Sequence, residues 1–291
     1  MLINIIFKFI ATLFLFFTFH INYCQEEIVK FTQPIDFIIL PNQLHETSGL
    51  IFFNGLLWTF NDSGGKPALY SFSNENGNII SYIKLKKGKN FDWEDITQDE
   101  EYIYIGDFGN NLGNRKNLRI FKIEKENIEA SNKSKIDFET IYFSYKEQTN
   151  FKPTLGQTSY DCESLISYKD QLIILTKDWK DKNSTVYTIS KEPGDYNLEK
   201  AHSIDINGLV TGAELFDKNK IILCGWNQIS PFISFIDILD YTILKTINFP
   251  HLKGYQIEGI TFDNKYLYLS SEKTAYPPCV FKIELNKIIN Y

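Results

Sequence analysis

Four glutamates recur at one position of a repeated sequence pattern. Glu46, Glu94, Glu163 and Glu258 each open a segment that contains a short apolar run, a polar turn and a second apolar run. Thr211 opens a fifth segment of the same form. Carboxylates held close together repel one another unless they are protonated, well separated and hydrated, or share a cation. Oxygen ligands of this type suit Ca²⁺, and suit Mg²⁺ less well, so the pattern first indicates cation binding.

The repeat also predicts the elements that position these glutamates. The five segments begin 48, 69, 48 and 47 residues apart. A polar turn separates the two apolar runs of each segment, a third run follows, and a fourth follows in four of the five. Short antiparallel strands in groups of four, without helical periodicity, are typical of propeller blades. The sequence therefore predicts an all-β protein, a five-bladed β-propeller.

The two ends of the repeat indicate how the ring would close. The fifth segment stops after its third strand, and the stretch at residues 28–40, which belongs to no repeat, would supply the missing strand. Such closure removes open sheet edges, and Pro34 is acceptable in an outermost strand. The 69-residue spacing contains polar stretches at 124–135 and 146–160, which we interpret as loop insertions. A sixth, degenerate blade is the alternative.

In a blade, the start of the first strand and the end of the second lie at the same end of the channel. The glutamates take the first of these places, and other acids and amides take the second or the entering loops. These others are Asn61, Asp62, Asp92, Asp107, Asp161, Asp178 and Glu272. One mouth of the channel should therefore collect carboxylates and amides from several blades. Two interpretations stay open: a cation bound at this mouth, or glutamates that each bond the backbone of a neighbouring blade.

Histidine and tryptophan residues add further candidates. His45 precedes Glu46 at the predicted mouth, where it would act as a general base or serve as a turn residue. Trp58, Trp93, Trp179 and Trp226 fall near second-strand ends or entering loops. Together with Asn61 they would form a binding platform for a sugar or another ring, or they would pack between blades. The sequence holds no zinc-protease motif, phosphate-binding loop or nucleophile elbow.

Residues 1–24 predict a signal peptide, because an apolar run at 9–19 follows Lys8 and is too short to span a membrane. Cleavage near Cys24 would leave residues 25–291 as a single propeller domain that is secreted or periplasmic. A lipid anchor at Cys24 is the alternative. We expect no transmembrane segment after signal cleavage.

Charge and cysteine content narrow the remaining classes. The net charge of −6 argues against a nucleic-acid partner. Cys162, Cys224 and Cys279 show no CxxC spacing, which argues against a zinc site. We expect them to be small buried residues with at most one disulfide among them, its pairing left open. We expect a monomer.

The segments ETSGL, NDSGG, DWEDI and GDFGNN, followed by Arg115, give residues 44–122 a resemblance to a group of exported bacterial propeller proteins. More distantly, the chain is similar to SdiA-regulated and NHL-type propellers. The paraoxonase and gluconolactonase families share this general plan and hold Ca²⁺ at the channel with Glu, Asp and Asn from successive blades. The resemblance implies a metal-ligand set here of Glu46, Asp62, Glu94, Asp107, Asn110, Glu163 and Glu258. Thr211 interrupts the acidic series, and Glu214 would substitute for it.

Three functions fit these observations. We expect an exported propeller whose acidic mouth binds a divalent cation, Ca²⁺, and through it a small-molecule, glycan or protein ligand. The first alternative is a calcium-dependent hydrolase of lactones, esters or phosphoesters. In it the cation would polarise the scissile oxygen, and His45 or an unbound carboxylate would act as the base. The second alternative is a scaffold that binds a protein or glycan without catalysis.

Overall fold

The computed structural model describes residues 27–129, 135–228 and 230–290. The predicted signal peptide at 1–24, with the alternative lipid anchor at Cys24, lies outside the described residues. Among the residues described, no helix is both long and apolar enough to cross a membrane.

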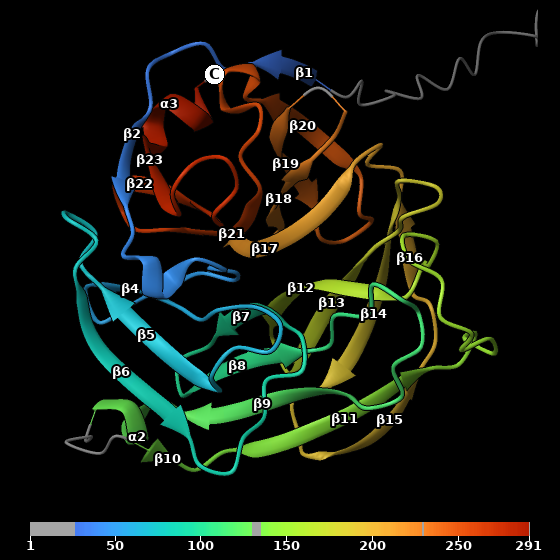
Figure 1. The fold of residues 1–291 in the computed structure, drawn as a ribbon. Helices are drawn as coiled ribbons and strands as arrows, with labels where there is room; N and C mark the ends of the chain where they lie inside the picture. The colour runs from blue at the N-terminus through green and yellow to red at the C-terminus, as the bar shows by residue number, and fades with distance from the viewer. Residues whose placement is uncertain (1–26, 130–134, 229, 291) are drawn as a thin grey trace, which may run out of the picture.

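Five sheets surround a common centre (Figure 1). Blade 1 contains β3 (Ile51–Phe53), β4 (Leu56–Thr59), β5 (Ala68–Phe72) and β6 (Ile79–Leu85). Blade 2 contains β7 (Trp93–Gln98), β8 (Tyr102–Asp107), β9 (Leu118–Glu124) and β11 (Glu139–Tyr145). Blade 3 contains β12 (Asp161–Tyr168), β13 (Gln171–Lys177), β14 (Ser184–Ser190) and β16 (His202–Ile204).

The C-terminal part of the chain forms the other two blades. Blade 4 contains β17 (Leu209–Asp217), β18 (Lys220–Trp226), β19 (Pro231–Asp237) and β20 (Ile243–Asn248). Blade 5 contains β21 (Ile257–Phe262), β22 (Tyr266–Ser271), β23 (Cys279–Glu284) and, from the N-terminal part, β2 (Asp36–Ile39). The first strands contact one another in the closed order β3, β7, β12, β17, β21 and β3. The fold is therefore the predicted five-bladed β-propeller.

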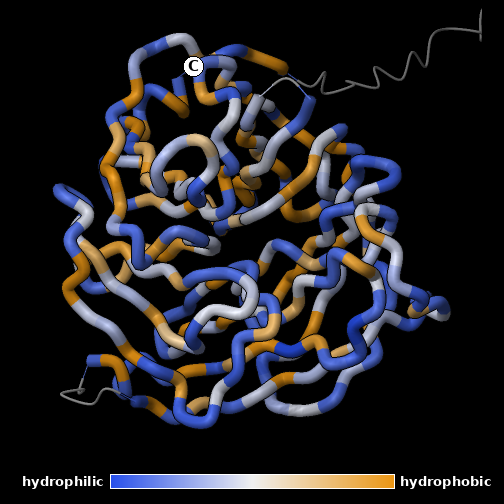
Figure 2. Tube along the Cα trace, viewed as in Figure 1, coloured by the Kyte–Doolittle hydropathy of each residue, from blue (hydrophilic) through white to orange (hydrophobic). Residues whose placement is uncertain are grey.

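The hydrophobic core lies between the blades. One cluster of buried apolar side chains fills each of the five interfaces between neighbouring blades. Strand β18 shows why both faces of a strand are apolar: Ile222 and Cys224 pack toward blade 5, while Ile221 and Leu223 pack toward blade 3. Successive side chains of a strand point to opposite faces, and both faces of a blade pack against a neighbouring blade. The middle strands of each blade therefore need an apolar residue at nearly every position. Figure 2 shows hydrophobic stretches along these strands and hydrophilic residues in many connecting loops.

The N-terminal segment closes the ring with its second half. Strand β2 pairs antiparallel with β23 and supplies the fourth strand of blade 5, as predicted. Its first half, β1 (Glu27–Lys30), instead pairs in parallel with β20 of blade 4. Pro34 lies between these two strands rather than inside one. The missing N–H of Pro34 therefore removes no hydrogen bond from a sheet.

Two other blades send a strand to their predecessor in the same way. Strand β15 (Gly194–Leu198), from blade 3, pairs in parallel with β11 of blade 2. Strand β10 (Lys135–Ile136), from blade 2, pairs in parallel with β6 of blade 1. Each added strand lies between the third and fourth strands of its own blade, and it covers an edge that would otherwise be open. The polar stretch at 124–135 is therefore an insertion that carries α2 (Lys125–Glu129) and β10.

The remaining elements are short connections. The stretch at 146–160 contains no strand, which agrees with its interpretation as a loop. Two 3₁₀ turns and one helix complete the described chain: η1 (Asn42–Leu44), η2 (Pro250–Leu252) and α3 (Leu285–Ile289). Cys162, Cys224 and Cys279 are buried free thiols, so no disulfide joins them.

Candidate functional site

The repeated acids lie at β-bulges. In blades 2 to 5 the register between the first and second strands shifts at one point near the channel mouth. The residues at these bulges are Glu94, Glu163, Thr211 and Glu258. A bulge adds an unpaired residue and re-aims its side chain. The repeat seen in the sequence is thus a repeat of irregularities in the innermost strands.

The register in blade 1 differs from the predicted alignment. Thr47 pairs with Asn61, and the next residue, Ser48, takes the position that Glu94 has in blade 2. Glu46 lies two residues before Ser48, so aligning Glu46 with Glu94 was incorrect. Ser48 donates a hydrogen bond to the Glu94 carbonyl at 2.5 Å, which joins the two blades at this level.

A hollow of about 170 Å³ opens at the mouth, and we call it the acidic chamber. It is lined by Ser48, Asp62, Glu94, Asn111, Glu163, Lys177, Trp179, Trp226, Gln256, Glu258 and Glu272. Five of these residues are acids that come from four blades or their connecting loops. Of the predicted metal ligands, the fold brings together Asp62, Glu94, Glu163 and Glu258.

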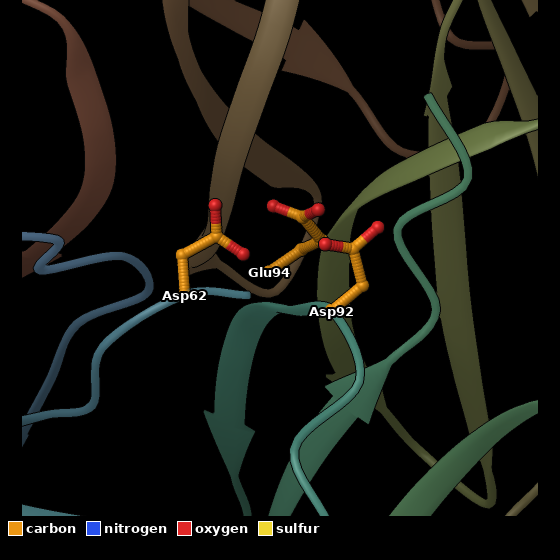
Figure 3. Close-up of side chains that lie close together, drawn as sticks. All are labelled: Asp62, Asp92 and Glu94. Atoms are coloured by element: carbon orange, nitrogen blue, oxygen red, sulfur yellow. The ribbon is translucent and has the colours of Figure 1, made fainter. Parts of the chain in front are cut away.

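Within the mouth, carboxylate oxygens form two overlapping groups that share Glu94. Asp62, Asp92 and Glu94 form the first group, and Glu94, Asp161 and Glu163 form the second. In each group one oxygen per residue lies within 4.8 Å of the others. Figure 3 shows the three carboxylates of the first group pointing toward one another.

Burial and mutual repulsion raise the pKa values of these acids. Burial, followed by the charge of Asp92, raises the pKa of Asp62 to about 8. Burial raises the pKa of Asp92 to about 6 and that of Glu258 to about 7. Burial, with the charges of Asp62 and Glu163, holds the pKa of Glu94 well above its ordinary value. Several of these groups thus carry protons near neutral pH when no cation is bound.

Two oxygens of the first group lack a hydrogen-bond partner. Among the described residues, no donor reaches Glu94 Oε1 or Asp62 Oδ1, although both atoms are buried. Glu94 as a whole is only 4% exposed. Gly109 backs onto this group, since a Cβ there would lie 1.9 Å from Glu94 Oε1 and 2.6 Å from Asp92 Oδ2. Buried acceptors without donors are costly, so these oxygens point to a ligand.

Lys177 is a member of the chamber that the sequence reasoning missed. Its Nζ lies 2.5 Å from Glu163 Oε1 and 4.0 Å from Asp161 Oδ2. It also lies 5.0 Å from the centre of the Trp179 ring. Burial alone would lower the pKa of Lys177, but the charges of Glu163, Asp161 and other acids outweigh burial and raise it. A blade-by-blade alignment of second-strand ends would have placed this lysine at the mouth.

Asp95, the next residue after Glu94, has all its acceptors occupied. Its Oδ1 accepts the N–H of Ile96 at 2.8 Å. Its Oδ2 accepts the N–H groups of Leu165 at 2.8 Å and Ala213 at 3.3 Å. Burial raises the pKa of Asp95, and these three N–H groups oppose that shift by stabilising the carboxylate. Asp95 thus joins blades 2, 3 and 4 at the axis.

Asp107 and Asn110, from the implied metal-ligand set, hold a loop instead of lining the chamber. Asp107 is fully buried and pairs with Arg115 at 2.9 Å and Arg119 at 2.7 Å. The Asn110 N–H donates to Asp161 Oδ1 at 2.5 Å, and its side-chain oxygen accepts the Arg115 N–H. The GDFGNN segment is therefore a rigid support behind Asp92 and Asp161.

Among the candidates for a binding platform, Trp179 and Trp226 line the chamber, and the others lie elsewhere. Trp58 and Trp93 are buried in the cluster between blades 1 and 2, where their Nε1 atoms donate to backbone carbonyls. Asn61 donates to the Gln43 carbonyl at 2.7 Å and so fixes a loop. Large aromatic side chains pack between blades here, which was the second interpretation offered above.

His45 and Glu46 lie together outside the chamber lining. His45 Nε2 is 3.6 Å from Glu46 Oε2, and the two side chains are 49% and 41% exposed. Glu214, expected as a substitute for Thr211, is half-buried and accepts a hydrogen bond from Thr261 at 3.2 Å. None of the three joins the two carboxylate groups.

The chamber continues into two further hollows that meet at Trp226. One, of about 540 Å³, is lined by residues that include Trp179, Tyr255 and Gln256. The other, of about 320 Å³, is lined by residues that include Lys182 and Asn207. The ring of Trp226 packs against Trp179 at 6.4 Å with an edge-on angle of 72°. Trp226 thus lines all three hollows.

Comparisons with known proteins agree on the fold. No protein-family model and no curated protein sequence matches the chain. The structure is similar to a glutaminyl cyclase of Myxococcus xanthus, with a TM-score of 0.58 and 13% identity, covering 89% of this chain and 97% of that one. It is also similar to regucalcin, a calcium-binding protein of Agrobacterium tumefaciens, with a TM-score of 0.45 and 12% identity over 88% and 95% of the two chains.

A gluconolactonase of Xanthomonas campestris gives a TM-score of 0.46 at 13% identity, covering 82% of this chain and 71% of that one. At 13% identity the likeness to the glutaminyl cyclase shows a shared architecture and nothing about activity. The closer relationship implied by the ETSGL, DWEDI and GDFGNN segments stays a prediction. The protein is a β-propeller with propeller-type structural neighbours.

Proposed function

We propose that the protein binds one divalent cation, Ca²⁺, at the channel mouth through Asp62, Asp92 and Glu94. The observation that carries this function is the pair of buried, unpartnered oxygens on Asp62 and Glu94. A cation would satisfy both oxygens and relieve the repulsion that raises the pKa values of these acids.

The spacing of the oxygens allows them to share one Ca²⁺. Oxygens bound to one Ca²⁺ at about 2.3–2.6 Å lie at most about 5 Å apart. The oxygens of the first group lie within 4.8 Å of one another. Only carboxylates form this group, which also favours a hard cation over zinc or copper.

The cation would hold an organic ligand that reaches it across Trp226. The hollows beside this indole are lined by aromatic rings and amides, which suit a ligand with a ring and several oxygen atoms. Export of the protein is part of the proposal, because weak calcium sites of extracellular modules fill at about 10⁻⁴–10⁻³ M. The N-terminal run at 1–24 supports export.

Calcium titration of the purified, EDTA-treated protein tests the site. We expect Ca²⁺ to raise Tm in the unaltered protein and to leave Tm unchanged in Glu94→Gln. Glu46→Gln is the matched control, since Glu46 belongs to the sequence repeat but lies outside the chamber, and it should respond like the unaltered protein. Equal responses of the Glu94 and Glu46 variants would contradict the proposal.

A second candidate function is calcium-dependent hydrolysis of an ester, lactone or phosphoester. The pKa of Glu258, raised to about 7 by burial, favours it, because a general acid or base works best near the operating pH. Glu258 lines the chamber, unlike His45. The test is a panel of aryl esters, lactones and phosphoesters with added Ca²⁺; loss of any activity in Glu258→Gln supports it, and activity unaffected by that change rules out this role.

A further inference from the structure

We propose that Lys177 is a tethered cation that occupies a second, latent metal site formed by Glu94, Asp161 and Glu163. Its ammonium group would limit the mouth to one divalent ion. This inference deepens the calcium-binding function proposed above by stating which of the two carboxylate groups takes the metal.

The contacts of Lys177 place its charge in the second group. Its Nζ pairs with Glu163 at 2.5 Å and lies 4.0 Å from Asp161, and the residue is 7% exposed. Water therefore contributes little to satisfying the ammonium, and the carboxylates supply its partners. Three carboxylates within 4.8 Å of one another need a nearby positive charge, and in this protein the lysine provides it.

Both oxygens of Asp161 in the second group are also engaged. Asp161 Oδ2 accepts the Nε1–H of Trp179 at 2.7 Å, and Asp161 Oδ1 accepts the Asn110 N–H at 2.5 Å. In the first group Asp62 Oδ1 has no donor among the described residues; Glu163 Oε1 of the second group also accepts no well-directed hydrogen bond, but the ammonium group of Lys177 lies against it. The two groups share Glu94, so the unpartnered Asp62 oxygen is what sets the first group apart as the one open to a metal ion.

The position of Lys177 in its blade supports this role. It ends the second strand of blade 3, opposite Asp161. Asp62 and Glu272 follow the second strands of blades 1 and 5 at the corresponding place, one residue beyond Asn61 and Ser271. Two blades thus present an acid where blade 3 presents an ammonium group. Removing the positive charge of Lys177 should therefore let the acids at the mouth hold one more cation.

Calorimetric titration with CaCl₂, together with elemental analysis of the bound metal, tests the inference. We expect one Ca²⁺ in the unaltered protein and two in Lys177→Met. Lys177→Arg keeps the charge and should bind one. Lys177→Met/Glu163→Gln removes the charge of Lys177 and one carboxylate of the latent site, so it should return to one.

The outcomes separate this inference from the proposed function. One ion in both the unaltered protein and Lys177→Met overturns the inference and leaves the calcium site in place. No ion in the unaltered protein and one in Lys177→Met refutes the proposed function and supports the inference. No ion in either refutes both.

The folding of Lys177→Met in calcium and in EDTA also tests the inference. Lys177→Met that folds with calcium and unfolds in EDTA supports the inference, because the metal then replaces the ammonium group. Lys177→Met that stays unfolded even in calcium, while Lys177→Met/Glu163→Gln folds, overturns it.

Discussion

The channel contains two regions of buried carboxylate that differ in how their oxygens are satisfied. Around Asp95, at the axis, three backbone N–H groups from three blades occupy both oxygens. One residue earlier on the same strand, Glu94 faces the acidic chamber, and its Oε1 has no donor among the described residues. The first region joins the blades; the second carries an electrostatic cost that a ligand would relieve. Glu94 and Asp95 are adjacent in sequence and both are buried. Only their hydrogen-bond partners distinguish the carboxylate that joins the blades from the one that is open to a ligand.

Removing the Asp95 carboxylate should give the largest effect. Asp95→Ala leaves three buried N–H groups without an acceptor, and each costs about 1–3 kcal/mol, so we expect the free energy of unfolding to fall by at least about 3 kcal/mol. Urea denaturation measures it. Asp95→Asn retains one acceptor oxygen and should lose less. A loss below about 1 kcal/mol in Asp95→Ala would show that the axis does not depend on this carboxylate.

Neutralising Glu94 should change stability in the opposite direction. Without metal, Glu94→Gln removes a buried, repelled acid, and we expect a gain of about 1 kcal/mol, as is common when functional groups are replaced. The same variant should lose the calcium-induced rise in Tm. Thermal unfolding in EDTA and in CaCl₂ measures both effects. Destabilisation in EDTA comparable to that of Asp95→Asn would remove the difference between the two regions.

A substitution at Gly109 tests whether calcium binding depends on the close packing of the backbone against the first group. A Cβ at Gly109 would collide with Glu94 Oε1 and approach Asp92 Oδ2, so Gly109→Ala should push the carboxylates apart. We expect calcium affinity to fall about tenfold, equivalent to about 1.4 kcal/mol, measured by calorimetry. Gly194→Ala, on the outer strand β15, is the matched control and should bind calcium normally. Unchanged affinity in Gly109→Ala would place the ion away from this group.

The stability of the metal-free protein should also depend on pH. The folded pKa values of Asp62, Glu258 and Asp92 are raised to about 8, about 7 and about 6, above their ordinary values of 3.8, 4.5 and 3.8. Between about pH 5 and 8 the folded protein therefore holds more protons than the unfolded chain, and stability without metal should rise as pH falls through this window.

Bound calcium should suppress this pH dependence of stability. A bound cation keeps the carboxylates ionised in the folded state, so saturating CaCl₂ should flatten the rise in Tm, and calcium affinity should weaken as pH falls. Thermal unfolding from pH 8 to pH 6, with and without CaCl₂, measures the difference. Parallel curves under the two conditions would argue that the titrating groups do not bind the metal.

Much of the fold was predictable from the sequence, because local rules define a blade. Apolar runs separated by polar turns identify hairpins, and their recurrence identifies a ring of equivalent units. The missing fourth strand of blade 5 likewise predicted that residues from the N-terminal part would close the ring, which β2 does. The parallel pairing of β1 with β20 was not predictable, since no local pattern specifies which neighbouring edge a short strand covers.

The candidate site depended on the tertiary structure much more than the fold did. The sequence by itself determined the number of blades and the presence of acids at one mouth, because strand periodicity and turn residues are local properties. Only the tertiary structure decided which acids converge, because bulges and a two-residue offset in blade 1 set where each side chain points. It also placed Asp107 between two arginines and Lys177 among the acids. Charge balance in a buried site depends on distances of a few ångströms between residues far apart in sequence.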